Sequence, residues 1–247
     1  KSKLYFFIFL LSNIITIQGQ SSKPIDGNGF NFEVLQTGTN TKYTEVGSGF
    51  FKNKFIMVAS KKIGGFAKID PNTNEAYKEL FCLDVDEKGA LSRPLLFSRL
   101  LNTSSSEDQL TFSPEEDVVY YTRSDQQNSL EFKLYSALLE EDSQGHWYNH
   151  TLLDINKPNV SIETPYVNHK GDKLYFSANF PDTIGGFDLY VSEINVDGTL
   201  GEPKNLGKTI NTELDDKYPS TSIDDKYLFF ASKGHENIGG FDIFRSK

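Results

Sequence analysis

The sequence predicts an all-β protein, a β-propeller built from repeated four-stranded antiparallel blades. Three observations indicate this fold class. The segment IGGFDLY (Ile184–Tyr190) returns as IGGFDIF (Ile238–Phe244), 54 residues later, and a repeat of that length is typical of propeller blades. Short runs of alternating residues, bounded by Gly, Asn, Asp and Pro, take the place of helical periodicity. The 20 Phe and 12 Tyr residues suit the faces of packed sheets.

The chain begins with a segment typical of secretory signal peptides. Basic residues precede an apolar run, Leu4–Ile17, and a polar exit follows. The run is too short for a membrane-spanning helix, and no later stretch of the sequence reaches that length. We therefore expect residues 1–19 to be a signal peptide and residues 20–31 to be a short polar linker in an exported protein.

Residues 32–247 are predicted to form the propeller. Each repeat contains an apolar, strand-like run that we assign as the second strand of a blade: Phe55–Ser60, Val118–Arg123, Lys173–Ala178 and Tyr227–Ser232. The approximate blade boundaries are 32–98, 99–154, 155–207 and 208–247.

The third repeat shows the order of elements most clearly. Thr164–His169 is the expected inner strand, and a turn at Lys170–Asp172 leads into the second strand. Phe187–Ile194 is the expected third strand. Asn195–Gly198 supplies a tight hairpin, since glycine tolerates positive φ, and Leu200–Leu206 is the expected outer strand.

The glycine pairs before the third strands have a mechanical interpretation. Gly185–Gly186 and Gly239–Gly240 allow a close backbone approach. Asp188 and Asp242 are expected to hold the turn by side chain-to-backbone hydrogen bonds. Because these residues recur once per repeat, a structural role is favoured over catalysis or metal binding. Asn-Thr pairs recur in the connectors, at Asn40, Asn102 and Asn211.

The two ends of the repeat region leave the closure of the ring open. Phe32–Thr41 matches Pro203–Thr212, so the region starts with an isolated outer strand, whereas the last repeat stops after its third strand. In one arrangement the first strand completes the last blade and closes a ring of four, because closure removes exposed strand edges. In the other, the blades belong to a ring of six.

The sequence from Lys170 to Lys247 resembles the TolB-like, WD-repeat-like propeller repeats of OmpA-family cell-envelope proteins of the Bacteroidetes. The resemblance rests on LYFSA (Leu174–Ala178), GGFDLY (Gly185–Tyr190) and DGTLGEPKNLGKTINT (Asp197–Thr212). It implies an exported, periplasmic or outer-membrane-associated scaffold with a protein or glycan partner. It implies no catalytic residues, and it does not assign peptidoglycan binding to these repeats. The family's repeat region runs further, which favours a larger ring with an incomplete last blade.

Composition and motifs argue against nucleic-acid binding, serine-hydrolase catalysis and metal binding. The net charge of −9, without a basic aromatic cluster, disfavours nucleic-acid binding. No G-x-S-x-G elbow is present, and Gly47–Gly49 lacks that pattern. Of the four histidines, only His146 and His150 approach a metal-ligand spacing, and a strand–turn context makes that signal weak. The sequence thus predicts no catalytic residue, cofactor or metal site and identifies no ligand-binding residue.

Two acidic loops resemble calcium sites only in part. Asp70–Glu75 alternates oxygen ligands but lacks the central glycine and the distant glutamate, so a polar loop is favoured. Asp84–Gly89 aligns with Asn195–Gly198 and is interpreted as a hairpin. The alternative function is a glycan-acting or glycan-binding propeller with carboxylates in its central channel.

Three further side chains carry expectations. Cys82 is the single cysteine, which excludes an intrachain disulfide, and a buried strand position is expected for it. Trp147 and Tyr148 are aromatics that could hold a sugar or a peptide. Their place at a hairpin favours packing on the outer strand instead.

Overall fold

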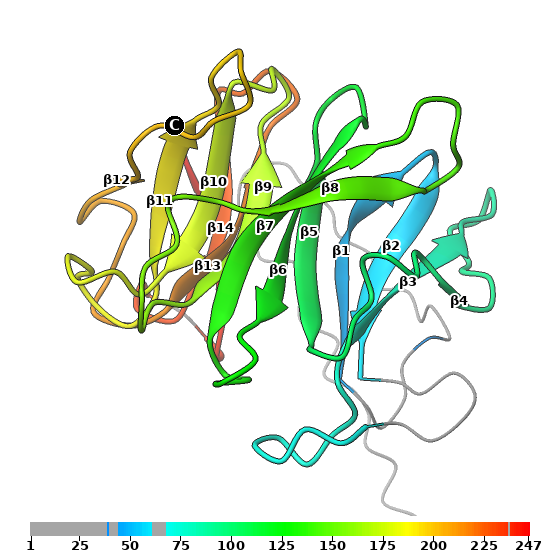
Figure 1. Cartoon of the computed structure of the whole chain (residues 1–247). Helices are drawn as coiled ribbons and strands as arrows, with labels where there is room; N and C mark the ends of the chain where they lie inside the picture. Colours follow the sequence, from blue (N-terminus) through cyan, green and yellow to red (C-terminus); the bar gives the residue numbers. More distant parts are fainter. Residues whose placement is uncertain (1–38, 40–43, 61–67, 237) are drawn as a thin grey trace, which may run out of the picture. The chain divides into compact units, whose positions relative to one another are not determined.

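The computed structural model describes residues 39, 44–60, 68–236 and 238–247. In this part of the chain, strands β1 to β15 form four antiparallel sheets and no helix is present (Figure 1). The sheets are blades of a β-propeller, which confirms the predicted fold class. The predicted signal peptide, the linker and the strand Phe32–Thr41, apart from Thr39, lie outside the described residues.

The strands of each blade follow one another in chain order, from the inner strand outward. Blade 1 contains β1 (Glu45–Phe51), β2 (Lys54–Ala59), β3 (Glu79–Asp84) and β4 (Leu95–Leu96). Blade 2 contains β5 (Glu107–Phe112), β6 (Val118–Ser124), β7 (Phe132–Leu139) and β8 (Trp147–Leu152). Blade 3 contains β9 (Ile162–Val167), β10 (Lys173–Ala178), β11 (Asp188–Glu193) and β12 (Lys204–Asn205). Blade 4 contains three strands, β13 (Asp216–Thr221), β14 (Leu228–Ser232) and β15 (Asp242–Ser246).

Two boundaries in blade 3 differ from the sequence prediction. The inner strand begins at Ile162 and ends at Val167, because the side chain of Asn168 already accepts hydrogen bonds from backbone N–H groups beyond the turn. The predicted outer strand Leu200–Leu206 is reduced to the two residues of β12 and an isolated bridge at Leu200. Pro203 between them has no N–H to donate to a ladder. The second strands agree with the prediction to within one residue.

Blades 2 and 3 each pack with one face against the blade before and with the other against the blade after. Side chains alternate along a strand, so in β6 Tyr121 packs toward blade 1 and Tyr120 toward blade 3. We call the face toward the next blade the forward face and the opposite one the rear face. The forward-face residues at one shared position of the third strands are Leu80, Leu134, Leu189 and Ile243.

Contacts run from each blade to the next. The inner strand β5 contacts both β1 and β9, and β9 also contacts β13. Within the described ranges, no strand of blade 1 contacts a strand of blade 4. The described strands therefore do not close a ring of four blades.

A single asparagine fastens each connector to the blade before it. Its side-chain oxygen accepts a bond from the N–H of the third-strand leucine, and its amide donates to the C=O of the same leucine. In every case the asparagine follows its leucine by 22 residues. The three pairs are Leu80 with Asn102, Leu134 with Asn156, and Leu189 with Asn211.

Replacing Asn211 with alanine is expected to lower the free energy of unfolding by about 2 kcal/mol. The N–H and C=O of Leu189 would lose their partner at a fully buried position, and an unsatisfied buried group costs about 1–3 kcal/mol. Urea denaturation followed by circular dichroism measures the change. Asn195→Ala is the control, because Asn195 is an exposed hairpin residue whose side-chain amide donates to the hydroxyl of Thr199.

The expectations for the aromatic pair and the cysteine have different outcomes. Trp147 is fully buried in β8, whereas Tyr148 is 47% exposed, so packing is confirmed for the first of them. Cys82 contacts the core between blades 1 and 2 but is only half-buried, and the expectation of a buried cysteine is wrong in degree. The reason is the short outer strand, whose Leu95 pairs with Cys82 and is itself exposed.

Candidate functional site: a charged cluster at the propeller axis

Charged residues occupy one shared position at the start of three inner strands. Each of them is the second residue of its strand: Asp108 in β5, Glu163 in β9 and Lys217 in β13. Lys78 lies directly before β3, and Tyr218 follows Lys217. We call these five residues the axial cluster, because inner strands surround the axis of a propeller.

The cluster contains two ion pairs, and each pair joins two blades. Lys78 Nζ lies 2.9 Å from Asp108 Oδ2 and links blade 1 to blade 2. Lys217 Nζ lies 2.7 Å from Glu163 Oε2 and links blade 4 to blade 3. All four side chains are largely withdrawn from solvent. Such charge-assisted hydrogen bonds fix the groups that they join.

The carboxylates of both ion pairs influence the pKa values of the same neighbouring groups. Burial opposes the charged form of Lys78, but the nearby carboxylates, Asp108 first and then Glu163, outweigh burial and raise the pKa of Lys78. Burial raises the pKa of Tyr218, and the same two carboxylates raise it further. The cluster is therefore one electrostatic unit shared by the four blades.

Aromatic rings complete the surroundings of the cluster. The ammonium group of Lys217 lies 3.5 Å from the centroid of the Phe187 ring, a cation–π contact. Tyr218 is 44% exposed and its ring meets that of Phe241 edge to face, with centroids 5.8 Å apart. The cluster thus offers solvent one aromatic side chain next to two neutralised charge pairs.

The inner strands contain β-bulges next to these charged residues. The inner strands are irregular at the position that follows the charged residue, and Thr164 and Tyr218 have φ angles of 50° and 58° there. A bulge bends a strand and redirects its side chains. Pro165 and Pro219 come next, and a residue without an N–H is tolerated at a bulge.

Glu107, the neighbour of Asp108, is a fully buried acid. Its Oε1 accepts bonds from the backbone N–H and the hydroxyl of Thr103, at 3.1 and 2.6 Å, and from Arg123 Nε at 3.1 Å. Its Oε2 has no hydrogen-bond partner among the described residues. Burial raises the pKa of Glu107 to about 7, against the opposing effects of Thr103 and Arg123.

The stability of the protein is expected to fall between pH 4.5 and pH 7 because of Glu107. Its pKa is about 7 in the folded chain, above the ordinary value of 4.5, so folding favours the protonated acid. This contribution is complete below pH 4.5 and is lost as the pH rises through 7. At about 1.4 kcal/mol per pKa unit, the shift from 4.5 to about 7 corresponds to a loss of about 3–4 kcal/mol.

Chemical denaturation of the wild type and of Glu107→Gln across this pH range tests the expectation. The glutamine variant cannot titrate, so its unfolding free energy should depend less steeply on pH by the stated amount. Parallel pH profiles of the two proteins would contradict the assignment.

Hydrogen bonds to protein groups occupy the loops considered as calcium sites. Asp70 Oδ1 accepts from the N–H of Asn72 and from the hydroxyl of Ser129, both at 2.9 Å. Asp84–Gly89 is a hairpin, as expected, with Gly89 at a φ of 79°. No group of three or more metal-ligating side chains occurs within the described part of the chain.

The remaining candidate residues have structural contacts and lie apart from the cluster. Ser48 exchanges two hydrogen bonds with the backbone of Leu110 in the neighbouring blade. His146 pairs with Glu140, whereas His150 bonds to the hydroxyl of Tyr121. The expected turn role of the repeated aspartates is confirmed, because both accept backbone N–H bonds from the glycine loops.

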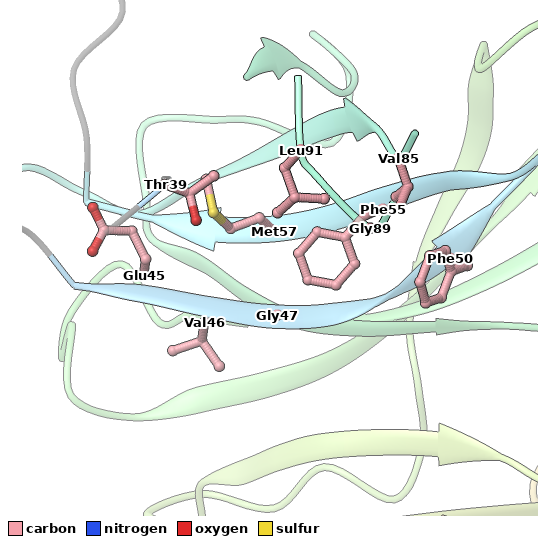
Figure 2. Close-up of a pocket in the computed structure, with 10 residues that line it drawn as sticks. All are labelled: Thr39, Glu45, Val46, Gly47, Phe50, Phe55, Met57, Val85, Gly89 and Leu91. Carbon is pink, nitrogen blue, oxygen red and sulfur yellow. The ribbon is translucent and has the colours of Figure 1, made fainter. Parts of the chain in front are cut away.

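A second candidate site is a pocket of about 350 Å³ on the rear face of blade 1 (Figure 2). Phe55 and Met57 of β2 line it together with Val85 and Leu91 from the hairpin that follows β3. Gly47 forms part of the wall, and a Cβ there would lie 2.7 Å from the Phe55 ring. The apolar lining suits an apolar side chain rather than a charged ligand.

No family model matches the chain, and no curated protein matches it in sequence. Among solved structures, TolB from Acinetobacter baumannii is similar at 11% identity and a TM-score of 0.44, over 78% of this chain and 38% of that one. A thermostable family-43 glycoside hydrolase is similar at 14% identity and a TM-score of 0.45, over 79% and 69%. A puromycin-hydrolyzing peptidase of Mycobacterium tuberculosis reaches 10% and 0.40, over 72% and 26%. These similarities transfer no activity.

None of the described residues forms a helix that is long and apolar enough to span a membrane.

Proposed function

We propose that this chain is a non-catalytic propeller that serves as an interaction scaffold of an exported cell-envelope protein, associated with the outer membrane or peptidoglycan. The axial cluster carries the proposal. Its two lysines and two carboxylates neutralise one another across blade boundaries. Groups used in this way join blades and do not remain available for proton transfer.

The other support comes from the sequence and from the remaining acids. The apolar run Leu4–Ile17 supports export, and the repeats after Lys170 support an OmpA-family context. Glu107 has a raised pKa, as a general acid would, but it is fully buried. We place the partner-binding surface at Tyr218, the exposed aromatic of the cluster.

Binding to envelope material tests this proposal. The purified protein is expected to bind isolated peptidoglycan sacculi or one envelope protein, and Tyr218→Ala should weaken that binding at least about tenfold. Tyr148→Ala is the matched control, because Tyr148 has a similar exposed fraction but lies on the outer strand of blade 2. Equal loss of binding in the two variants would remove the assignment of the surface to the cluster.

A glycan-acting propeller is the second candidate, favoured by the same exposed ring. An aromatic beside two carboxylates can stack on a sugar and present acids to it. Release of reducing ends from a panel of envelope and plant polysaccharides is the measurement. Turnover by the wild type that disappears in Glu163→Gln would support this candidate and overturn the scaffold proposal.

A further inference from the structure

A pocket of about 320 Å³ lies at the boundary between blades 2 and 3, and we call it the rim pocket. Both blades have four strands among the described residues, so complete blades bound it. Its apolar lining comes from β6 and β7, with Val118, Tyr120 and Leu138, and from Leu200 after the hairpin of blade 3. Its polar lining includes Asn149, Thr151, Asp154 and Asp197.

The equivalent place at the boundary between blades 1 and 2 is filled by Trp147. Leu139 and Ile194 both lie five residues after the shared leucine of a third strand, and their strand partners are Trp147 and Leu200. Trp147 is fully buried among three phenylalanine rings, whereas Leu200 is only half-buried. The smaller leucine therefore leaves room where an indole lies one blade earlier.

The outer strand beside the rim pocket has an unpaired edge among the described residues. β8 has six residues, whereas β4 and β12 have two (Figure 1), and it is the last strand of its sheet. The N–H of Leu153 donates inward to Leu134 of β7, so the alternation of antiparallel pairing turns the N–H and C=O of Leu152 outward. Leu152 lines the pocket and is 49% exposed. An extended segment can pair with such an edge.

The chain around the rim pocket is acidic. Residues 134–156 contain four acidic residues and no Lys or Arg, and residues 174–203 contain five acidic residues and again no Lys or Arg. Asp154 and Asp197 are the exposed acids of the pocket lining. Asp197 is held in place, because its Oδ1 accepts from the N–H and the hydroxyl of Thr199, at 3.0 and 2.6 Å. The charge at the mouth of the pocket is therefore complementary to a cation.

We propose that the rim pocket binds an extended segment of a partner protein, which inserts one aromatic side chain between blades 2 and 3 and places a Lys or Arg beside it. The inserted ring takes the place that Trp147 has one blade earlier. The backbone of the segment pairs with Leu152, and its cation faces Asp154 and Asp197. Aromatic side chains that fill pockets dominate the binding energy of many interfaces.

A peptide segment is favoured over a glycan as the occupant. A sugar stacks on an accessible aromatic face, but Tyr120 is only 3% exposed at the floor of the pocket. Two carboxylates and an outward-facing N–H and C=O instead match the charge and the backbone of a basic peptide. Tyr218 does not line this pocket, so the rim pocket is a surface additional to the axial cluster.

Peptide binding tests the proposal directly. The probes are labelled peptides of about ten residues with a central Trp, Leu, Ala or Ser, flanked by two Lys or by two Glu. The peptide with Trp between lysines is expected to bind at least about tenfold more tightly than those with Ala between lysines or Trp between glutamates. No binding, or equal binding of all lysine peptides, would overturn the proposal. Binding of neutral oligosaccharides at this pocket in place of the peptides would overturn it as well.

Filling the rim pocket separates binding there from binding elsewhere. Leu200→Trp places an indole where the partner's ring is expected, so it should abolish binding of the Trp peptide and raise the thermal unfolding midpoint. Val196→Trp is the matched control, because Val196 is a fully exposed residue of the same hairpin. Tyr218→Ala should also bind the peptide like the wild type, which distinguishes this surface from the axial cluster. A folded Leu200→Trp variant that still binds the peptide would overturn the proposal.

Removing a charge gives a second variant that leaves the packing unchanged. Asp154→Asn is expected to weaken binding of the Trp peptide about threefold to tenfold at low salt and to reduce its dependence on salt. Asp142→Asn is the control, since Asp142 is an exposed acid that does not line the pocket. Circular dichroism verifies folding of both variants. Equal weakening by the two substitutions would show attraction by the net charge of the protein alone and would overturn the assignment of the cation site.

Discussion

Replacing Trp147 with alanine is expected to lower the free energy of unfolding by about 4 kcal/mol, the largest single effect of a substitution in this protein. Trp147 is fully buried between blades 1 and 2. Its ring lies 5.4 Å from the ring of Phe51, 6.4 Å from that of Phe97 and 5.7 Å from that of Phe112, measured between centroids. Alanine would leave a cavity bounded by three rings, which come from β1, from β5 and from the residue after β4, and which cannot collapse into it together.

Denaturant unfolding of matched variants measures this effect. Tyr148→Ala is the control one residue away on the opposite face, and it should cost less than about 0.5 kcal/mol. Trp147→Phe should cost clearly less than alanine, because Trp147 Nε1 has no hydrogen-bond partner among the described residues and phenylalanine removes no bond there. Similar losses for Trp147→Ala and Tyr148→Ala would show that the aromatic cluster does not hold blades 1 and 2 together.

Gly185→Ala is expected to cost about 3 kcal/mol, although it adds one methyl group. The Cβ would lie 2.4 Å from the backbone carbon of Glu213 and 2.5 Å from the carbonyl oxygen of Thr212. Neither atom belongs to a flexible side chain, so the connector must move, and overpacking of this kind costs up to about 3 kcal/mol. The unfolding midpoint in urea should fall without a change in the slope.

Gly239→Ala is the matched control in the equivalent loop. Its methyl group has no atom within 4 Å, so the unfolding free energy of the isolated chain should change by less than about 0.5 kcal/mol. Destabilisation of the two glycine variants by equal amounts would mean that the loop itself, and not the packed connector, requires glycine.

Much of the fold could be predicted because a repeated sequence segment indicates a repeated structural unit. The 54-residue shift between Ile184 and Ile238 identifies blades, and the alternation within β6 or β10 identifies strands to within one residue. Outer strands could not be predicted as well. They are short, and Pro203 interrupts the ladder of blade 3.

The axial cluster could not be predicted for a different reason. Its partners are 30 and 54 residues apart and belong to different blades. The repeats preserve the position but not the charge, since Glu163 in β9 corresponds to Lys217 in β13. When the repeats are aligned, a glutamate opposite a lysine is taken as an unrelated difference and not as the two halves of an ion pair. The available signal was a charged residue before a Thr-Pro or Tyr-Pro pair inside an inner strand.

The constant 22-residue distance between leucine and asparagine determines where such a protein can vary in length. An insertion within that interval would move the asparagine side chain out of hydrogen-bonding reach of the third-strand leucine. The blades that follow would then change position. The loop between the second and third strands is not under this restriction, and it runs from Ala59 to Glu79 in blade 1 but only from Ser124 to Phe132 in blade 2. New loops, whether acquired in evolution or grafted by an engineer, are tolerated there.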